Sequence, residues 1–182
     1  GCGNDSIAGT MIQSPERKVA ELDPKTGKRK WTRMVAPNYR NAMGNGPRAT
    51  PAIHDGVVYA FTGEGILVAL SAETGSVIWS ANLPARHSGR TAEYGMASSP
   101  LIYGDTVIAT IGAPGATVVA VNQKTGETVW TAGKGDPAGY SSPAILKIGK
   151  TDQLVVFTGS AVLAVNPKNG QQLWKHEYVT GY

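Results

Sequence analysis

The sequence predicts an all-β protein built from four copies of one antiparallel, four-stranded unit. The chain has four tryptophans, which recur at similar intervals, each after a turn of related sequence: "TGKRKW", "TGSVIW", "TGETVW" and "NGQQLW". A second mark keeps nearly the same spacing, in the segments "DSIA", "ATPA", "SSPL" and "SSPA", at Ser6, Thr50, Ser99 and Ser142. Two independent marks with one period indicate internal repeats of one structural unit.

The second unit shows the expected strand order most clearly. Short β-branched and aromatic runs at 50–54, 57–61, 66–70 and 76–79 are separated by Asp55-Gly56 and other turn residues. The third unit repeats the order, and so does the fourth, with "GKTDQ" (149–153) as one of its turns; the first is compressed. No helical periodicity is present. We expect a single domain over 1–182 with blades at roughly 3–34, 48–81, 97–132 and 140–176.

Repetition of this unit predicts a β-propeller with four blades present. One small sheet cannot bury both faces alone, whereas sheets repeated around an axis bury each face against a neighbour. The third strand of each unit ("ILVAL", "TVVAV", "VLAV") does not alternate with polar residues, which indicates burial on both faces.

The tryptophans and the turn glycines are predicted to be structural. Each indole is expected to pack over the turn of the neighbouring blade and to donate its N–H there. The glycine of each turn is expected to need a positive φ. The residues concerned are Trp31, Trp79, Trp130 and Trp174, with Gly27, Gly75, Gly126 and Gly170.

The repeats "LVALSAETGSVIW" (67–79) and "VVAVNQKTGETVW" (118–130) resemble the tryptophan-docking motif of the PQQ-like β-propellers, and the resemblance covers essentially the whole chain. That family includes BamB-type propellers and the quinoprotein alcohol dehydrogenases, which hold pyrroloquinoline quinone (PQQ) and calcium beside two adjacent cysteines. The resemblance implies an exported protein, periplasmic or extracellular, with a membrane anchor outside this segment as a further option. It also implies about eight blades in a closed ring.

A non-catalytic scaffold or binding module is the favoured function, and part of a PQQ-dependent quinoprotein alcohol dehydrogenase is the alternative. The single cysteine, Cys2, excludes an adjacent pair and an internal disulfide, and "GCGN" leaves open a lipid anchor on it. We expect no catalytic residue, no metal site and no cofactor, with PQQ and calcium as the alternative. The histidines lack metal-ligand spacing, and the acidic residues resemble solvated turn residues: His54, His87 and His176, and Asp5, Glu64, Glu93, Asp136 and Asp152.

Candidate ligand-binding residues lie at the expected channel mouth and in two long connections. The positions two before the serine or threonine marks are Asn4, Arg48, Ala97 and Tyr140, which are expected to form a column. The connections 35–46 and 82–95 are the expected recognition loops for a protein or polymer partner, and Gly-rich 112–116 and 133–139 are expected to be turns. The candidates are Asn4, Arg48, Arg86, His87, Arg90, Tyr94 and Tyr140.

The charge distribution and the hydropathy of the chain argue against nucleic-acid binding and against a membrane-spanning segment. The net charge of +4 comes from dispersed Lys and Arg with one cluster at 28–30, so no nucleic-acid surface is expected. No run approaches the about 18 apolar residues of a membrane span, so no transmembrane segment is expected. The blade count leaves three options: a fragment of a longer propeller, which is favoured, a homodimer that completes the ring, which is second, or a small four-bladed ring.

Overall fold

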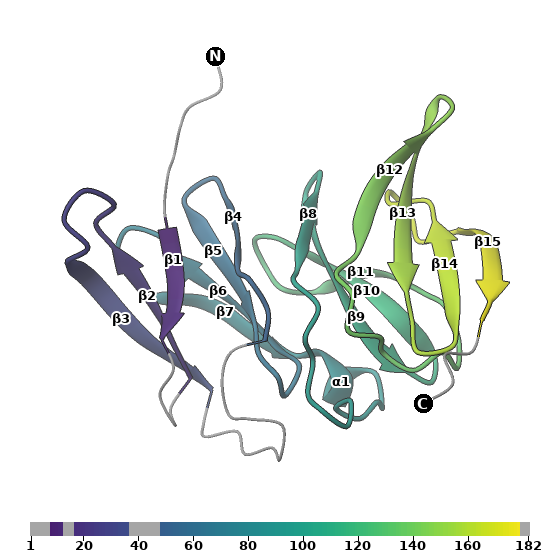
Figure 1. Ribbon diagram of the computed structural model, residues 1–182, viewed down its shortest axis with the longest axis horizontal. Coiled ribbons are helices and arrows are strands. Elements are labelled where there is room, and N and C mark those ends of the chain that lie inside the picture. The colour runs from purple at the N-terminus through teal and green to yellow at the C-terminus, as the bar shows by residue number, and fades with distance from the viewer. Residues whose placement is uncertain (1–7, 13–16, 37–47, 179–182) are drawn as a thin grey trace.

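The described residues, 8–12, 17–36 and 48–178, form four antiparallel sheets in this computed structural model. Figure 1 shows the sheets side by side along an arc, in the order of the sequence. We call them blades 1 to 4. Each sheet contains strands from one repeat alone, which confirms the predicted all-β fold of propeller blades.

Blade 1 has three strands among the described residues, and the other blades have four each. Blade 1 contains β1 (Ala8–Ile12), β2 (Arg17–Leu22) and β3 (Arg29–Ala36). Blade 2 contains β4 (Ala52–His54), β5 (Val57–Phe61), β6 (Ile66–Ser71) and β7 (Val77–Asn82). Blade 3 contains β8 (Leu101–Tyr103), β9 (Thr106–Ala113), β10 (Ala116–Asn122) and β11 (Thr128–Ala132). Blade 4 contains β12 (Ala144–Ile148), β13 (Thr151–Phe157), β14 (Ala161–Val165) and β15 (Gln172–Glu177).

Two local predictions were wrong. The segment 149–153 was expected to be a turn, but β13 begins at Thr151 because Thr151 and Asp152 pair with Ile148 and Lys147. A helix was not expected, yet α1 (Leu83–Arg86) forms one turn after blade 2, capped by Asn82, whose Oδ1 accepts the Ala85 N–H at 3.0 Å. One turn is too short to show helical periodicity. Within the described ranges, no helix has the length and apolar character needed to cross a membrane.

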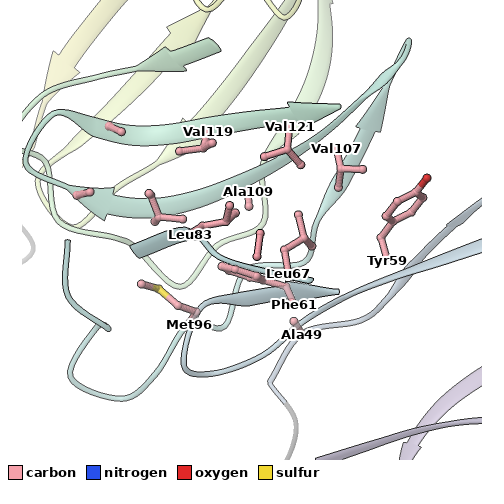
Figure 2. Close-up of a cluster of buried hydrophobic side chains, with 14 of the residues drawn as sticks. Ala49, Tyr59, Phe61, Leu67, Leu83, Met96, Val107, Ala109, Val119 and Val121 are labelled. Carbon is pink, nitrogen blue, oxygen red and sulfur yellow. The ribbon is translucent and has the colours of Figure 1, made fainter. Parts of the chain in front are cut away.

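The hydrophobic core lies between the blades. From β6, Leu67 and Ala69 face blade 3, whereas Val68 and Leu70 belong to the cluster shared with blade 1, and all four are at most 1% exposed. Figure 2 shows the cluster between blades 2 and 3, where Phe61 and Leu67 lie opposite side chains of β9 and β10. The prediction that the third strand is covered on both faces is therefore confirmed for blade 2.

Tryptophan docking joins the blades as predicted at two junctions. The indole N–H of Trp31 donates to the Ala72 carbonyl at 2.8 Å, and that of Trp79 donates to the Gln123 carbonyl at 2.8 Å. Each ring lies against a turn glycine of the next blade: a Cβ built on Gly126 would be 2.6 Å from Trp79 Cε3, and one on Gly75 would overlap Trp31. Glycine is required at these two turns by contact as well as by φ values of 70° and 67°.

The other two tryptophans depart from the prediction. Trp130 packs on Gly170, 2.6 Å from its Cβ position, and is only 8% exposed, but its Nε1 has no hydrogen-bond partner. Trp174 is 39% exposed and donates to Gln153 Oε1 of its own blade at 2.8 Å. The prediction of an N–H bond to a neighbouring turn is therefore wrong for both, and Trp174 has no neighbouring turn among the described residues.

The serine and threonine marks form a second set of contacts between blades. The Thr50 N–H donates to Ser99 Oγ at 2.9 Å, and the Ser99 N–H donates to Ser142 Oγ at 2.9 Å. Each hydroxyl therefore holds the first strand of the preceding blade. This explains the second periodic mark of the sequence, because a small hydroxyl side chain is needed once per blade at this position.

Candidate binding site at the blade 2 to blade 4 loops

The connection between blades 2 and 3, the end of β9 with its following loop, and the connection between blades 3 and 4 line a half-open cavity of about 620 Å³. One wall is the segment after α1, a second is the connection between β9 and β10, and a third is the connection between blades 3 and 4. The lining residues are Ser88, Gly89, Arg90, Thr91, Ala92, Glu93, Ile111, Gly112, Pro114, Pro137, Ala138 and Tyr140.

Glycines let these walls approach one another. A Cβ built on Gly89 would be 2.7 Å from the Ala113 Cβ, and one on Gly112 would overlap the backbone of Ala138. Ser88, with φ of 56°, turns the chain before Gly89. The three loops are therefore held in backbone contact, which preforms the cavity from segments far apart in the sequence.

Asp136 anchors the third wall. Its Oδ1 accepts the Ser160 hydroxyl at 2.8 Å and pairs with Lys175 Nζ at 2.9 Å, both from blade 4. Hydrogen bonding to Asp136 raises the pKa of Lys175, so the ammonium stays charged over a wider pH range. Asp136 is 3% exposed, and the expectation that it is a solvated turn residue is therefore wrong. Its burial fixes the start of the loop that carries Pro137 and Tyr140.

Three of the predicted ligand-binding residues gather at the cavity. Arg90 and Tyr140 line it, and the ring of Tyr94 lies 6.0 Å from the ring of Tyr140 between centroids. Tyr94 and Tyr140 are 42% and 50% exposed, and Arg90 is also exposed. Within the described ranges, the Arg90 side chain has no hydrogen bond or ion pair. We call Arg90, Tyr94 and Tyr140 the rim cluster.

The remaining candidates lie elsewhere. Arg86 Nη1 donates to the Gly126 carbonyl at 2.6 Å, and His87 Nε2 is 3.2 Å from Thr128 Oγ1, so both join blade 2 to blade 3. Burial, with the nearby Arg86 charge, lowers the pKa of His87 and favours neutral imidazole. Arg48 is half-buried, already engaged in a contact, and does not line the cavity. Asn4 lies outside the described residues.

Sequence reasoning missed the apolar wall of the cavity. Ile111, Pro114, Pro137 and Ala138 belong to segments that were interpreted as a strand end and as plain turns. The sequence does show that the long loop 82–95 is followed by two Gly-rich segments, 112–116 and 133–139. No local pattern in the sequence indicates that these three segments line one cavity.

The described residues contain no cluster of metal-binding side chains. No group of three or more His, Cys, Asp or Glu in the described ranges is close enough to hold an ion, and the chain has one cysteine. A bound calcium requires about six to eight oxygen ligands. The described residues therefore do not fit calcium, or PQQ held beside adjacent cysteines.

The similar curated proteins include two quinone-dependent dehydrogenases. Quinoprotein ethanol dehydrogenase of Pseudomonas aeruginosa is 34% identical over 120 residues, which are 64% of this chain and 19% of that protein. 1-Butanol dehydrogenase (quinone) of Thauera butanivorans is 31% identical over 120 residues, with the same coverage of 64% and 19%. The chain therefore spans 19% of the length of these relatives.

Solved structures show the same fold. BamB from Moraxella catarrhalis matches with a TM-score of 0.71 and 21% identity, over 97% of this chain and 51% of that chain. Quinohemoprotein alcohol dehydrogenase from Comamonas testosteroni matches with a TM-score of 0.69 and 18% identity, over 94% and 33%. A family model described as outer membrane protein assembly factor BamB matches residues 10–181. By this match and by its tryptophan-docked blades, the chain belongs to the BamB family of PQQ-like propellers.

Proposed function

We propose that this chain is a non-catalytic binding module of an exported protein and that the rim cluster holds a protein partner. The observation that carries the proposal is Arg90 beside an exposed tyrosine pair, Tyr94 and Tyr140, at the edge of a preformed cavity. Arginine and tyrosine are enriched in protein interfaces and supply a large share of their binding energy. The family description, outer membrane protein assembly factor, supports the export.

The chemistry of the cavity favours an extended acidic segment with an aromatic or proline residue. The Arg90 guanidinium is free to form a bidentate pair with a carboxylate. The wall formed by Ile111, Pro114 and Pro137 gives an apolar surface beside it. The chain's net charge of +4 also favours an acidic partner.

A display library of random peptides panned against the chain tests this function. Enriched peptides are expected to contain Asp or Glu next to an aromatic or proline residue. Arg90→Ala and Tyr140→Ala are each expected to weaken their binding by at least about tenfold. Lys134→Ala is the matched control, because Lys134 is an exposed cation near the same loop and does not line the cavity. Peptides that bind both rim variants as tightly as the native chain contradict the proposal.

A second candidate function is part of a quinone-dependent alcohol dehydrogenase. The observation that favours it is the 34% identity over 120 residues to quinoprotein ethanol dehydrogenase. The described residues do not support this function, because they contain no cluster of metal-binding side chains and the chain has no pair of adjacent cysteines beside which PQQ could lie.

Thermal unfolding with added PQQ and Ca²⁺ separates the two functions. For a dehydrogenase segment with its cofactor site intact, ligand at a hundredfold excess over Kd is expected to raise the free energy of unfolding by about 2.7 kcal/mol. For a binding module, the free energy of unfolding is expected to stay unchanged. A gain that Arg90→Ala leaves unchanged would support the dehydrogenase reading against the rim cluster.

A further inference from the structure

A second cavity lies between blades 3 and 4, at the end of the blades opposite the rim cluster. Its volume is about 260 Å³, and residues of β8, the β12–β13 hairpin and the β14–β15 turn line it. Tyr103, just before β9, lines this cavity, whereas Gly112, near the end of β9, lines the cavity at the rim cluster. We call it the lysine cavity, and its lining includes Tyr103, Lys147, Lys150, Thr151, Asp152 and Lys168.

The first hairpin of blade 4 is longer than those of blades 2 and 3, and its added residues build the lysine cavity. β4 and β8 have three residues each, whereas β12 has five, and Figure 1 shows the β12–β13 hairpin reaching beyond β8. Ile145 pairs with Leu154, and both pack in the cluster shared with blade 3. Lys147 and Asp152 form the next pair with the same side-chain direction, so they also face blade 3. The added residues therefore place charged groups over the junction.

The lysines of this cavity keep their charges unpaired. Within the described ranges, Lys147, Lys150 and Lys168 have no ion pair. Asp152, the one acidic residue of the described lining, accepts instead from the Tyr103 hydroxyl at 3.3 Å. Three ammonium groups and one carboxylate leave a local net charge of +2.

Neutral donors lie beside the lysines. Asn166 also lines the cavity, and its Oδ1 accepts the Lys168 backbone N–H at 3.0 Å. Its side-chain N–H groups and the Thr151 hydroxyl have no other partner in the part of the chain that the structure describes. The cavity therefore offers several donors together with its positive charge.

We propose that the lysine cavity binds a phosphate monoester. Such a group carries about −1.5 to −2 charge at pH 7 and three strong acceptor oxygens, so it matches both the net charge and the surplus of donors. A carboxylate has one charge and two oxygens, and it pairs best with the planar fork of arginine, which the described lining lacks. Lysine binds phosphate as a point charge.

A neighbouring cavity of about 540 Å³ gives room for the rest of the ligand. It shares Tyr103 and Lys168 with the lysine cavity, and Val129 and Pro167 add apolar surface to it. Asp105 also lines it, and its carboxylate would repel a second anionic group. The ligand is therefore expected to carry one phosphate on a neutral body, either as a small soluble phosphate or as the headgroup of a lipid.

Two binding measurements on the chain test the proposal and distinguish the two sources. Calorimetric titration with glycerol 3-phosphate tests the soluble source, and co-sedimentation with phosphatidylcholine vesicles that contain phosphatidic acid tests the lipid source. Both probes carry a phosphate monoester, and at least one is expected to bind, whereas glycerol and vesicles of phosphatidylcholine alone are not. Lys147→Ala and Lys168→Ala are each expected to weaken binding by at least about tenfold. Both lysines are exposed, so the fold is expected to stay intact, which circular dichroism checks.

Lys124→Ala is the matched control. Lys124 and Lys168 stand at the same position of the tryptophan-docking turns of blades 3 and 4, two residues before Gly126 and Gly170. In each turn the lysine N–H donates to the asparagine that starts the turn, at 2.8 and 3.0 Å. Lys124 lines neither of the two cavities. Its replacement removes the same charge from the same end of the blades and is expected to leave binding unchanged.

Binding of glycerol 3-phosphate would assign the soluble source, and binding to the phosphatidic acid vesicles alone would assign the lipid source. Four results overturn the proposal. The first is that neither probe binds. The second is that Lys147→Ala and Lys168→Ala bind as tightly as the native chain, which means that the phosphate lies elsewhere. The third is that Lys124→Ala loses as much binding as Lys168→Ala, which means that the overall positive charge attracts the probe. The fourth is that succinate binds as tightly as glycerol 3-phosphate, which means that the site does not select phosphate.

Discussion

The junction between blades 2 and 3 and the outer face of blade 4 contain the same motif in two environments. Trp79 donates to the Gln123 carbonyl of the next blade and lies against Gly126, whereas Trp174 donates to Gln153 within its own blade. Phe61 is 2% exposed and Phe157 is 46% exposed at equivalent positions. The comparison shows that the tryptophan motif supplies only one side of the contact between two blades. Whether the tryptophan stabilises the fold depends on whether the turn of the next blade lies against it.

The largest expected difference is between two alanine variants. Trp79→Ala removes a docked indole between two blades and is expected to cost about 3–5 kcal/mol of unfolding free energy. Trp174→Ala is expected to cost under about 1 kcal/mol because the side chain is partly exposed. Urea denaturation of both variants measures the difference. Equal costs would contradict the assignment of Trp174 as undocked.

The next difference is between two docking glycines. Alanine at Gly126 or Gly27 must adopt a positive φ, and this backbone strain is expected to lower the free energy of unfolding by about 1–2 kcal/mol. At Gly126 the new Cβ would also lie 2.6 Å from the Trp79 ring, which adds about 1–3 kcal/mol, whereas at Gly27 it meets nothing. Thermal unfolding of Gly126→Ala and Gly27→Ala is therefore expected to show the larger loss of stability for Gly126→Ala. A larger loss for Gly27→Ala would mean that its turn is docked.

A smaller difference isolates the indole N–H. Trp79→Phe removes the 2.8 Å hydrogen bond to the Gln123 carbonyl, whereas Trp130→Phe removes an Nε1 that has no partner. Both variants lose the same ring volume, so Trp79→Phe is expected to cost about 0.5–1.5 kcal/mol more. Denaturant titration of the two variants checks this, and a greater cost for Trp130→Phe would show that its N–H is bonded in solution.

The smallest expected effect is a pH dependence confined to the turn of blade 1. Backbone N–H groups of Thr26 and Lys25, at 2.9 and 2.8 Å from Asp23 Oδ1, lower the pKa of Asp23. The stabilisation is therefore present above the unfolded carboxyl pKa of about 3.9 and is lost as the pH falls through the lower folded pKa. Blade 3 has Asn122 at this position, which accepts the same kind of bonds and does not titrate.

NMR shifts of the Lys25 and Thr26 amides against pH measure this effect. They are expected to titrate with Asp23, and the amides of Lys124 and Thr125 are expected to stay constant. Asp23→Asn is the control that removes the titration while keeping the acceptor. Amides that titrate equally in this variant would assign the effect to another group.

The sequence by itself determined the repeat and most of the strands and turns of this protein. Runs such as 57–61 and turns such as Asp55-Gly56 follow from side-chain alternation and backbone preference, which are local. It also placed Arg90 and Tyr94 among the candidates, because long loops in a propeller carry recognition, and Tyr140, because it stands two residues before the Ser142 mark.

Only the tertiary structure decided which parts are covered. It separated docked Trp79 from undocked Trp174, buried Asp136 against Lys175, and joined three distant loops into one cavity. These outcomes depend on contacts between residues in different blades, and such contacts are absent from any local pattern. Burial and docking are therefore properties of pairs of blades, whereas the motif is a property of one.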